Sequence, residues 1–351
     1  MKQRVRFCES FDGTRLAFAT TGEGPPLVRS PHWLTHLDYE WQSPIWRPWI
    51  EALSRGRMLL RMDERGCGLS DRDAANISLE AWVRDLEAVV DAAGLERFAL
   101  FGHSQGGAIA VEYAVRHPER VTHLVLLGAY ARGRLKREIS PNHFAELEAL
   151  RKLVEVGWGR NDPAYRQLFS MGFIPGGTLE QLNSMSELQR TSATAGVAAR
   201  ILGAMFEIDV TASAPRVACP TLVLHAKGDH RVPFEEGRLF ASLIPGARLV
   251  TLETENHILL SHEPEFRRFF EELDAFLPRA RGSGAFAELT PREAEVLEHI
   301  ARGLDNAQIA AHLGISGKTV RNNITRIFDK LAVENRSQAI VLARDHGFGR
   351  G

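Results

Sequence analysis

The feature that most constrains this chain is a serine placed between an apolar strand and a helix. The run LFGHSQGGAI covers residues 100–109, so Ser104 lies in a turn flanked by Gly102 and Gly106. A serine in so tight a turn needs a strained backbone, which the flanking glycines permit because they carry no Cβ. The turn lifts the Ser104 hydroxyl clear of the predicted sheet, near a helix N-terminus whose amides favour negative charge. This pattern is typical of a nucleophile elbow.

Strand and helix patterns alternate on both sides of this turn. Short apolar runs predict buried strands at 27–30, 58–62, 98–101, 121–127, 221–226 and 247–252, and an edge hairpin at 5–8 and 16–20. Helical periodicity appears at 79–93, 107–117 and 264–277. Such alternation predicts a doubly wound, mostly parallel α/β sheet with right-handed crossovers.

Between residues 131 and 215 the strand signal disappears, and apolar residues recur with helical spacing. We expect a helical cap over the carboxyl ends of the strands, where open parallel sheets bind ligands and where Ser104 lies. A satellite bundle that only packs against the sheet is the alternative. The expected first domain is residues 1–277, with the cap at about 131–215.

Two further polar residues follow predicted strands at the same end of the sheet. Asp229 follows the strand at 221–226, and His257 follows the strand at 247–252. With Ser104 they give the order Ser, Asp, His, and residues 63–70 read DERGCGLS. In these features the sequence resembles the α/β-hydrolase family. The resemblance implies that Ser104 attacks a carbonyl carbon, His257 accepts its proton and Asp229 orients the imidazole.

The loop that supplies the oxyanion hole departs from the family pattern. That pattern is His-Gly-X after the strand, whereas this chain has Pro31-His32-Trp33. The resemblance implies an oxyanion hole formed by the backbone amides of Trp33 and Gln105. Loss of one such donor typically lowers the rate about 100- to 1,000-fold, so we expect modest turnover. In the turn at 63–70, the residues that we interpret as structural are Asp63, Arg65 and Cys67.

Composition and charge argue against several classes of protein. A net charge of −1 disfavours a protein that is basic throughout, although a local basic face remains compatible with it. The three cysteines lie far apart without metal-type spacing, and no secretory leader precedes them, which favours a reducing cytoplasm. No apolar run approaches the roughly 20 residues that cross a bilayer. We therefore expect no metal, no cofactor and no membrane contact.

A second module follows residues 278–287, a glycine-containing stretch that we predict to be a linker. Thr290, Pro291 and Glu293 combine an N-cap threonine, a proline at the first helical position and a glutamate at the third. Helices are predicted at 291–302, 306–313, 317–331 and from Ser337 to about 344. The module, expected at 288–351, resembles the LuxR/GerE-type helix-turn-helix over nearly its whole length. The matching residues include Leu289, Gly303, Asn306, Gly314, Val320, Lys330 and Asn335.

The third helix of this module separates an apolar face from a polar one. Apolar residues at 320, 324, 327, 328 and 331 form one core-facing stripe. The other face carries residue types that pair with base edges or phosphates in a major groove. We expect double-stranded DNA as a partner and a homodimer that is held by the helix from Ser337. The residues expected to contact DNA are Lys318, Thr319, Arg321, Asn322, Thr325, Arg326 and Lys330.

These features support one principal hypothesis and two alternatives. The principal hypothesis is a transcription regulator whose hydrolase-like domain senses a small ester, lactone or acyl ligand, with slow hydrolysis of that ligand as an option. One alternative is a working serine esterase or lactonase with an accessory DNA-binding domain. The other is a scaffold that only binds partners, which has no need for Ser104, Asp229 and His257 together. The ligand, the operator sequence and the direction of regulation stay open.

Overall fold

The computed structural model describes residues 1–137, 141–158, 169–277, 286, 289–331, 333, 335–345 and 347–349. The chain forms two compact units, the first drawn mainly from residues 1–278 and the second from 279–351. Each unit is described by itself. The linker predicted at 278–287 lies outside the described residues, apart from Phe286.

The first unit is built on an eight-stranded sheet in the order β1-β2-β4-β3-β5-β6-β7-β8. Strands β1 and β2 form an antiparallel hairpin and β2 pairs antiparallel with β4, whereas every later pairing is parallel. The expected doubly wound, mostly parallel sheet is thus confirmed. The strands are β1 (Gln3–Glu9), β2 (Arg15–Thr21), β3 (Pro26–Arg29), β4 (Met58–Met62), β5 (Phe98–His103), β6 (Val121–Leu127), β7 (Thr221–Ala226) and β8 (Arg248–Leu252).

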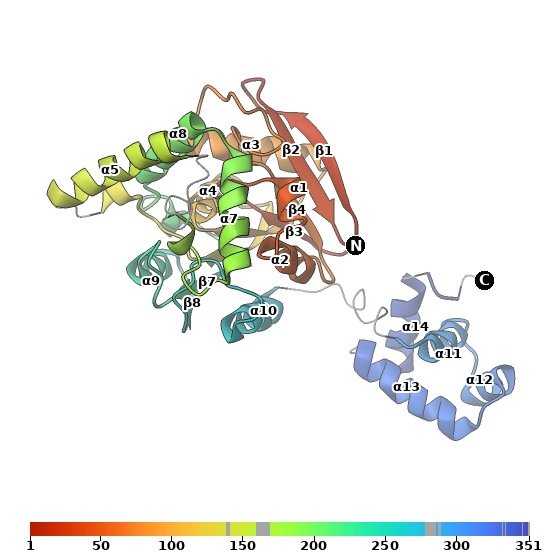
Figure 1. Ribbon diagram of the computed structural model, residues 1–351. Helices are drawn as coiled ribbons and strands as arrows, with labels where there is room; N and C mark the ends of the chain where they lie inside the picture. Colours follow the sequence, from red (N-terminus) through yellow and green to blue (C-terminus); the bar gives the residue numbers. More distant parts are fainter. Residues whose placement is uncertain are drawn as a thin grey trace. The chain divides into compact units, whose positions relative to one another are not determined.

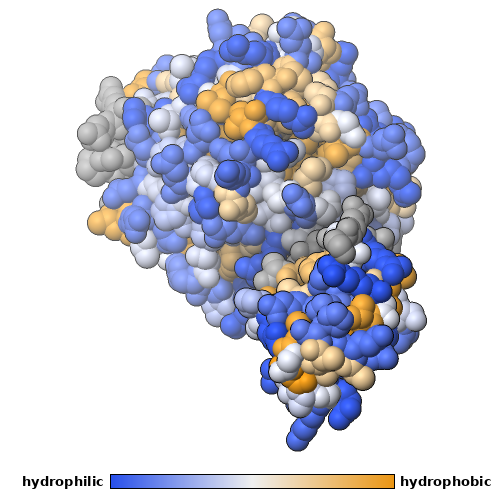
Figure 2. Space-filling view, turned by 90° about the vertical axis from the view of Figure 1, so that its right-hand side faces the viewer, coloured by the Kyte–Doolittle hydropathy of each residue, from blue (hydrophilic) through white to orange (hydrophobic). Residues whose placement is uncertain are grey.

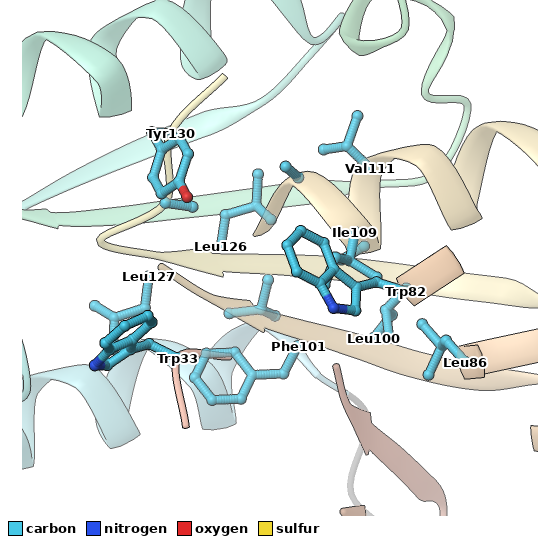
Figure 3. Close-up of a cluster of buried hydrophobic side chains, with 14 of the residues drawn as sticks. Trp33, Trp82, Leu86, Leu100, Phe101, Ile109, Val111, Leu126, Leu127 and Tyr130 are labelled. Carbon is cyan, nitrogen blue, oxygen red and sulfur yellow. The ribbon is translucent and has the colours of Figure 1, made fainter. Parts of the chain in front are cut away.

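Helices pack on this sheet through apolar side chains. In Figure 3, Trp82 and Leu86 of one helix and Ile109 of another gather around Leu100 of β5 and Leu126 of β6. These strands are buried along most of their length, as expected for a parallel sheet that is covered on both faces. The helices are α1 (Leu37–Glu40), α2 (Trp46–Leu53), α3 (Leu79–Ala92), α4 (Gln105–Arg116), α9 (Phe234–Leu243) and α10 (Pro264–Phe276).

The hairpin strand β1 forms one edge of the sheet. Its exposed residues include Arg4, Arg6 and Glu9, charges that disfavour pairing with another strand. Figure 2 shows this side of the chain, where hydrophilic side chains divide the hydrophobic surface into separate patches.

The segment between β6 and β7 contains the helices α5 (Pro141–Gly157), α7 (Leu179–Ser192) and α8 (Ala195–Phe206), drawn yellow to green in Figure 1. Thr178 caps α7 in a capping box with Gln181, and Thr194 caps α8. The predicted helical cap is therefore present in the described part of 131–215. None of the helices in the described ranges is long and apolar enough to cross a bilayer.

The second unit is helical. Its helices are α11 (Pro291–Ala301), α12 (Asn306–Leu313), α13 (Gly317–Leu331) and α14 (Arg336–Asp345). Thr290 and Glu293 form a capping box at α11, and Asp305 does the same at α12 with Gln308. Gly314 ends α12 with φ of 61°, a left-handed conformation that favours glycine. The buried core residues are Val296, Leu297, Ile300, Ala301, Ile309, Val320, Ile327, Leu331 and Ala343.

Candidate active site and nucleic-acid interface

Ser104 lies between β5 and α4 in a strained conformation. Its φ is 55° and its ψ is −125°, a region that L-residues rarely occupy. A Cβ on Gly102 would lie 2.6 Å from the Gly107 Cα, and one on Gly106 would lie 2.6 Å from the Pro31 carbonyl oxygen. Only glycine fits at these two positions, so the local sequence dictates the turn that presents Ser104 at the helix N-terminus.

Asp229 and His257 are brought together at the carboxyl ends of β7 and β8. His257 Nδ1 lies 2.6 Å from Asp229 Oδ2, and the other carboxylate oxygen accepts the amides of Arg231 (2.7 Å) and Val232 (2.9 Å). Burial acts to raise the pKa of Asp229, but the His257 charge and the hydrogen bonds from His257 and Val232 outweigh it and lower that pKa. An ionised Asp229 holds the proton on His257 Nδ1 and leaves Nε2 free to act as a base.

The Nε2 atom of His257 is buried and has no hydrogen-bond partner in the part of the chain that the structure describes. Ser104 itself is only 4% exposed and lines a cavity at the same edge of the sheet. Gly128, with φ of 54°, leaves space for the imidazole, because a Cβ there would lie 3.1 Å from the His257 ring. The structure thus pairs Asp229 with His257, whereas it records no hydrogen bond between His257 and Ser104.

The cap segment that precedes α7 is attached to the loop that carries His257. The Phe173 carbonyl oxygen accepts the backbone amides of His257 (2.9 Å) and Ile258 (3.2 Å), and Asn256 Oδ1 accepts the amide of Gly176. A second imidazole, His103, stacks on His257 with 5.0 Å between ring centroids. Burial, followed by the charge of His257, lowers the pKa of His103 to about 3, so His103 remains neutral.

The predicted oxyanion donors are the backbone amides of Trp33, in the loop after β3, and of Gln105, the first residue of α4. No hydrogen bond from the backbone amide of Trp33 or Gln105 to another described residue is present, which leaves both amides free for a ligand. Leu34, next to Trp33, has φ of 53°, so this loop is strained as well. The role of the two amides as oxyanion donors stays a prediction.

A buried carboxyl group supports the loop after Ser104. Gln105 Nε2 donates to Glu64 Oε1 (2.8 Å), and the Glu64 amide donates to Thr35 Oγ1 (2.7 Å). Burial raises the pKa of Glu64 to about 8, although the Gln105 side chain and the backbone of Leu34 partly oppose this shift. Glu64 is therefore neutral at pH 7. Through its side chain and its backbone amide, it links Gln105 at the start of α4 to Thr35 in the loop after β3.

The neighbouring residues of the 63–70 turn have structural partners. Asp63 accepts the amides of Leu37 and Leu69, both at 2.8 Å. Arg65 donates to Asp12 (2.7 Å) and Asp85 (2.6 Å). These contacts agree with the interpretation that Asp63 and Arg65 stabilise a turn.

The cavity beside Ser104 contains residues that sequence reasoning missed. Arg134 and Arg137 come from the segment after β6, and Arg231 follows Asp229 after β7. Tyr130 and three apolar residues of α8 complete much of the wall. Trp33, Trp158, Met171 and Phe173, which are aromatic and apolar residues of the same unit, do not line this cavity.

In the second unit, helix α13 exposes one polar face and buries the opposite face. Val320, Ile327 and Leu331 are buried against the other helices. Six of the residues expected to contact DNA are exposed and share this helix: Lys318, Thr319, Arg321, Asn322, Thr325 and Arg326.

Lys330, the remaining predicted DNA contact, is engaged within the unit. Its Nζ donates to Glu293 Oε2 (2.6 Å), whose side chain is 3% exposed. The hydrogen bond from Lys330, followed by that from the Thr290 amide, lowers the pKa of Glu293. Lys330 thereby ties α13 to the capping box of α11, and its contact with DNA stays a prediction.

Comparison with known proteins matches each part of the chain to a family model. Residues 39–264 match the model of the alpha/beta hydrolase fold, and residues 287–343 match that of bacterial regulatory proteins of the luxR family. Among the described residues, no group of three or more histidine, cysteine or carboxylate side chains could hold a metal ion.

Individual relatives differ in the reactions for which they are named. The chain is 26% identical over 257 residues to a pyrrolizixenacetamide deacetylase of Xenorhabdus hominickii, covering 72% of this chain and 91% of that protein. It is 27% identical over 263 residues to a non-heme chloroperoxidase of Streptomyces lividans, covering 72% and 93%. A solved esterase of Exiguobacterium antarcticum shares the fold, with a TM-score of 0.66 at 23% identity over 78% of this chain and 99% of that chain.

Proposed function

Because the chain belongs to the α/β-hydrolase fold family and carries a luxR-family regulatory domain, we propose that it is a DNA-binding transcriptional regulator. Its hydrolase domain binds a small ester, lactone or acyl compound and hydrolyses it slowly. The observation that carries this proposal is the exposed polar face of α13 on a chain that also holds a paired Asp229 and His257.

The DNA-binding part of the proposal depends on the exposed side chains of α13. Arginine pairs with guanine, asparagine with adenine, and threonine contacts the thymine methyl group, so Arg321, Asn322 and Thr325 suit a major groove. Selection of duplexes from a random pool tests this assignment. We expect the full chain to enrich a sequence motif, and we expect Arg321→Ala to weaken binding to that motif by about 1–3 kcal/mol. Absence of any sequence preference in the selected pool contradicts the proposal.

The hydrolytic part follows from the site geometry. Ser104 Oγ attacks the carbonyl carbon while His257 Nε2 takes the hydroxyl proton, and the alcohol leaves with that proton. Water, deprotonated by His257, then attacks the acyl-serine, which releases the carboxylic acid and regenerates Ser104. Labelling by a fluorophosphonate, lost in Ser104→Ala, tests the nucleophile directly. An unlabelled wild-type chain that is inert toward a broad ester panel counts against hydrolysis.

A serine esterase or lactonase with an accessory DNA-binding domain is the second candidate function. Two observations favour this candidate: Asp229 is hydrogen-bonded to His257, and Ser104 has a strained backbone. The two candidates differ in one measurement, the effect of a bound ester on DNA affinity. A regulator changes its DNA affinity when the cavity is filled, whereas an enzyme with an accessory domain does not.

We also propose that the regulator acts as a homodimer through α14. Val341 on this helix is 61% exposed, so an apolar side chain of α14 is accessible to a partner helix. Dimers of helix-turn-helix proteins place two recognition helices about one DNA turn apart. Analytical ultracentrifugation is expected to show a dimer for the wild type and a monomer for Val341→Glu, and a monomeric wild type on DNA contradicts this part.

A further inference from the structure

The cavity beside Ser104 has an uneven distribution of charge. Its empty space, with the adjoining open solvent included, is about 340 Å³. Leu202, Met205 and Phe206 of α8 form an apolar wall, whereas Arg134, Arg137 and Arg231 contribute guanidinium groups. None of its described lining residues carries a carboxylate, so the cavity has a concentrated positive charge next to the proposed nucleophile.

The guanidinium groups of this cavity lack full partners within the described residues. Neither Arg134 nor Arg231 forms an ion pair there. The guanidinium group of Arg134 donates a hydrogen bond from Nη2 to the backbone carbonyl oxygen of Arg231 at 3.4 Å. Arg137 lies 3.5 Å from Glu236, a carboxylate that Arg132 already binds at 2.9 Å. Two further acids act on these arginines: Glu146 on Arg134, and Asp229, which is hydrogen-bonded to His257, on Arg231.

Each arginine is partly buried, and the protein does little to compensate its charge. Burial lowers the pKa of Arg134 and Arg137, and burial together with the charge of Arg134 lowers that of Arg231 to about 10. Arg231 instead lies over the Phe173 ring, 4.4 Å from the ring centroid. Burying charges without partners destabilises a fold, so such a cluster calls for an anion from outside the protein.

A buried hydroxyl group in the same wall supports this interpretation. Tyr130 is 4% exposed, and its hydroxyl has no hydrogen-bond partner in the described residues. Burial raises the pKa of Tyr130, so the hydroxyl stays protonated and is a donor. Buried polar groups are normally hydrogen-bonded, and an unpaired donor at a cavity wall points to a ligand acceptor.

We infer that the cavity binds the carboxylate end of an acyl ligand, with Arg134, Arg137, Arg231 and Tyr130 holding the anion while the ester or lactone carbonyl lies at Ser104. This inference rests on the proposed function and names the ligand class: a small ester or lactone that carries a carboxylate at the end of a short carbon chain. The apolar wall of α8 contacts that carbon chain.

Isothermal titration calorimetry with a matched pair of esters tests the inference. Monomethyl adipate and methyl hexanoate share an ester and a carbon chain, and differ only in a terminal carboxylate against a methyl group. On the full-length Ser104→Ala chain, where ligand is not consumed, we expect the anionic ester to bind about ten-fold or more tightly than the neutral ester, the range of a charge-assisted hydrogen bond.

Variants of the cavity wall assign this preference to its residues. Added to Ser104→Ala, the pair Arg134→Gln and Arg231→Gln is expected to abolish the preference for the anionic ester. Arg216→Gln removes one positive charge from an exposed position outside the cavity and is expected to retain the preference. Tyr130→Phe, which keeps the packing, is expected to weaken binding of the anionic ester alone.

Three results would overturn the inference: equal binding of the two esters, a preference that survives both arginine substitutions, or no saturable binding of monomethyl adipate. If inorganic phosphate displaces monomethyl adipate at lower concentrations than acetate does, the cavity prefers phosphate esters. That result would also overturn the inference of a carboxylate ligand. These measurements contain no DNA. If the anionic ester shows no preference in these experiments, the regulatory proposal is not affected. If DNA affinity is the same with and without a bound ester, the inference of an anion site is not affected.

Discussion

Ser104, the proposed nucleophile, lies in a strained backbone conformation. Its conformation, φ of 55° and ψ of −125°, is one that glycine adopts without steric conflict and alanine does not. Both Ser104→Gly and Ser104→Ala lack the hydroxyl. We expect the free energy of unfolding of Ser104→Gly to be about 1–3 kcal/mol higher than that of Ser104→Ala. Chemical denaturation of the two variants measures the difference. Equal stabilities would show that the elbow stores no strain.

Glu64 is expected to couple stability to pH. Its pKa is raised to about 8 in the folded chain from an ordinary value of 4.5, so unfolding releases its proton between these limits. The free energy of unfolding therefore falls as pH rises from about 4.5 to about 8. Glu64→Gln keeps an acceptor for Gln105, and we expect it to reduce this fall by roughly 2–4 kcal/mol.

The control for this measurement is Glu9→Gln, which changes an exposed glutamate on β1. Urea denaturation at a series of pH values compares the two variants with the wild type. A Glu64→Gln profile parallel to the wild-type profile contradicts a neutral buried carboxyl. Burial also raises the pKa of Asp63 to about 7, so Asp63 contributes to the pH dependence that remains in the Glu64→Gln variant.

The sequence predicted some site residues and not others, for a physical reason. Ser104, Asp229 and His257 each follow a predicted strand, so local patterns place them at one sheet edge, and the structure does pair the latter two. Arg134 and Arg231 lie almost one hundred residues apart and meet only through the tertiary fold. The only local signal was a basic run, residues 132–137, after a strand end. The helical spacing of Lys330 places it with the polar residues of α13. In the structure its ammonium group donates to the Glu293 carboxylate on α11, a contact that local spacing does not encode.

At the scale of elements, α11 and α13 are joined by the Lys330–Glu293 ion pair. Because Glu293 is buried, Lys330→Met leaves a carboxylate without this partner and is expected to destabilise the α11 capping box. Hydrogen exchange of the α11 amides measures this change. Arg321→Ala, on the exposed face, is expected to leave exchange unchanged and to weaken DNA binding. The reverse pattern contradicts the division of α13 into a structural and a DNA-binding face.

Most elements were predictable because their signals are local. Capping residues and periodicity placed α12 and α13 at the residues observed, and apolar runs placed β4, β6 and β7 likewise. The segment 173–177 reads FIPGG, and its proline and two glycines are typical of a loop. In the structure it hydrogen-bonds to the loop of His257, a contact between residues about eighty positions apart that no local pattern encodes.

At the scale of the whole molecule, one polypeptide carries both the cavity beside Ser104 and a luxR-family regulatory unit. Filling the cavity regulates transcription only if the filled and empty states differ in DNA affinity, and such coupling typically amounts to about 5- to 150-fold. By the same linkage, DNA changes ligand affinity by the same factor. An enzyme that merely carries a DNA-binding domain has no such coupling.

The measurement that tests this account most directly is fluorescence anisotropy of a selected duplex with the full-length Ser104→Ala chain. Titrations are made without ligand and with monomethyl adipate at a concentration that calorimetry shows to saturate the cavity. The account predicts a change in DNA affinity of about five-fold or more, absent in the Arg134→Gln and Arg231→Gln variant. Identical titration curves with the cavity filled and empty would contradict it.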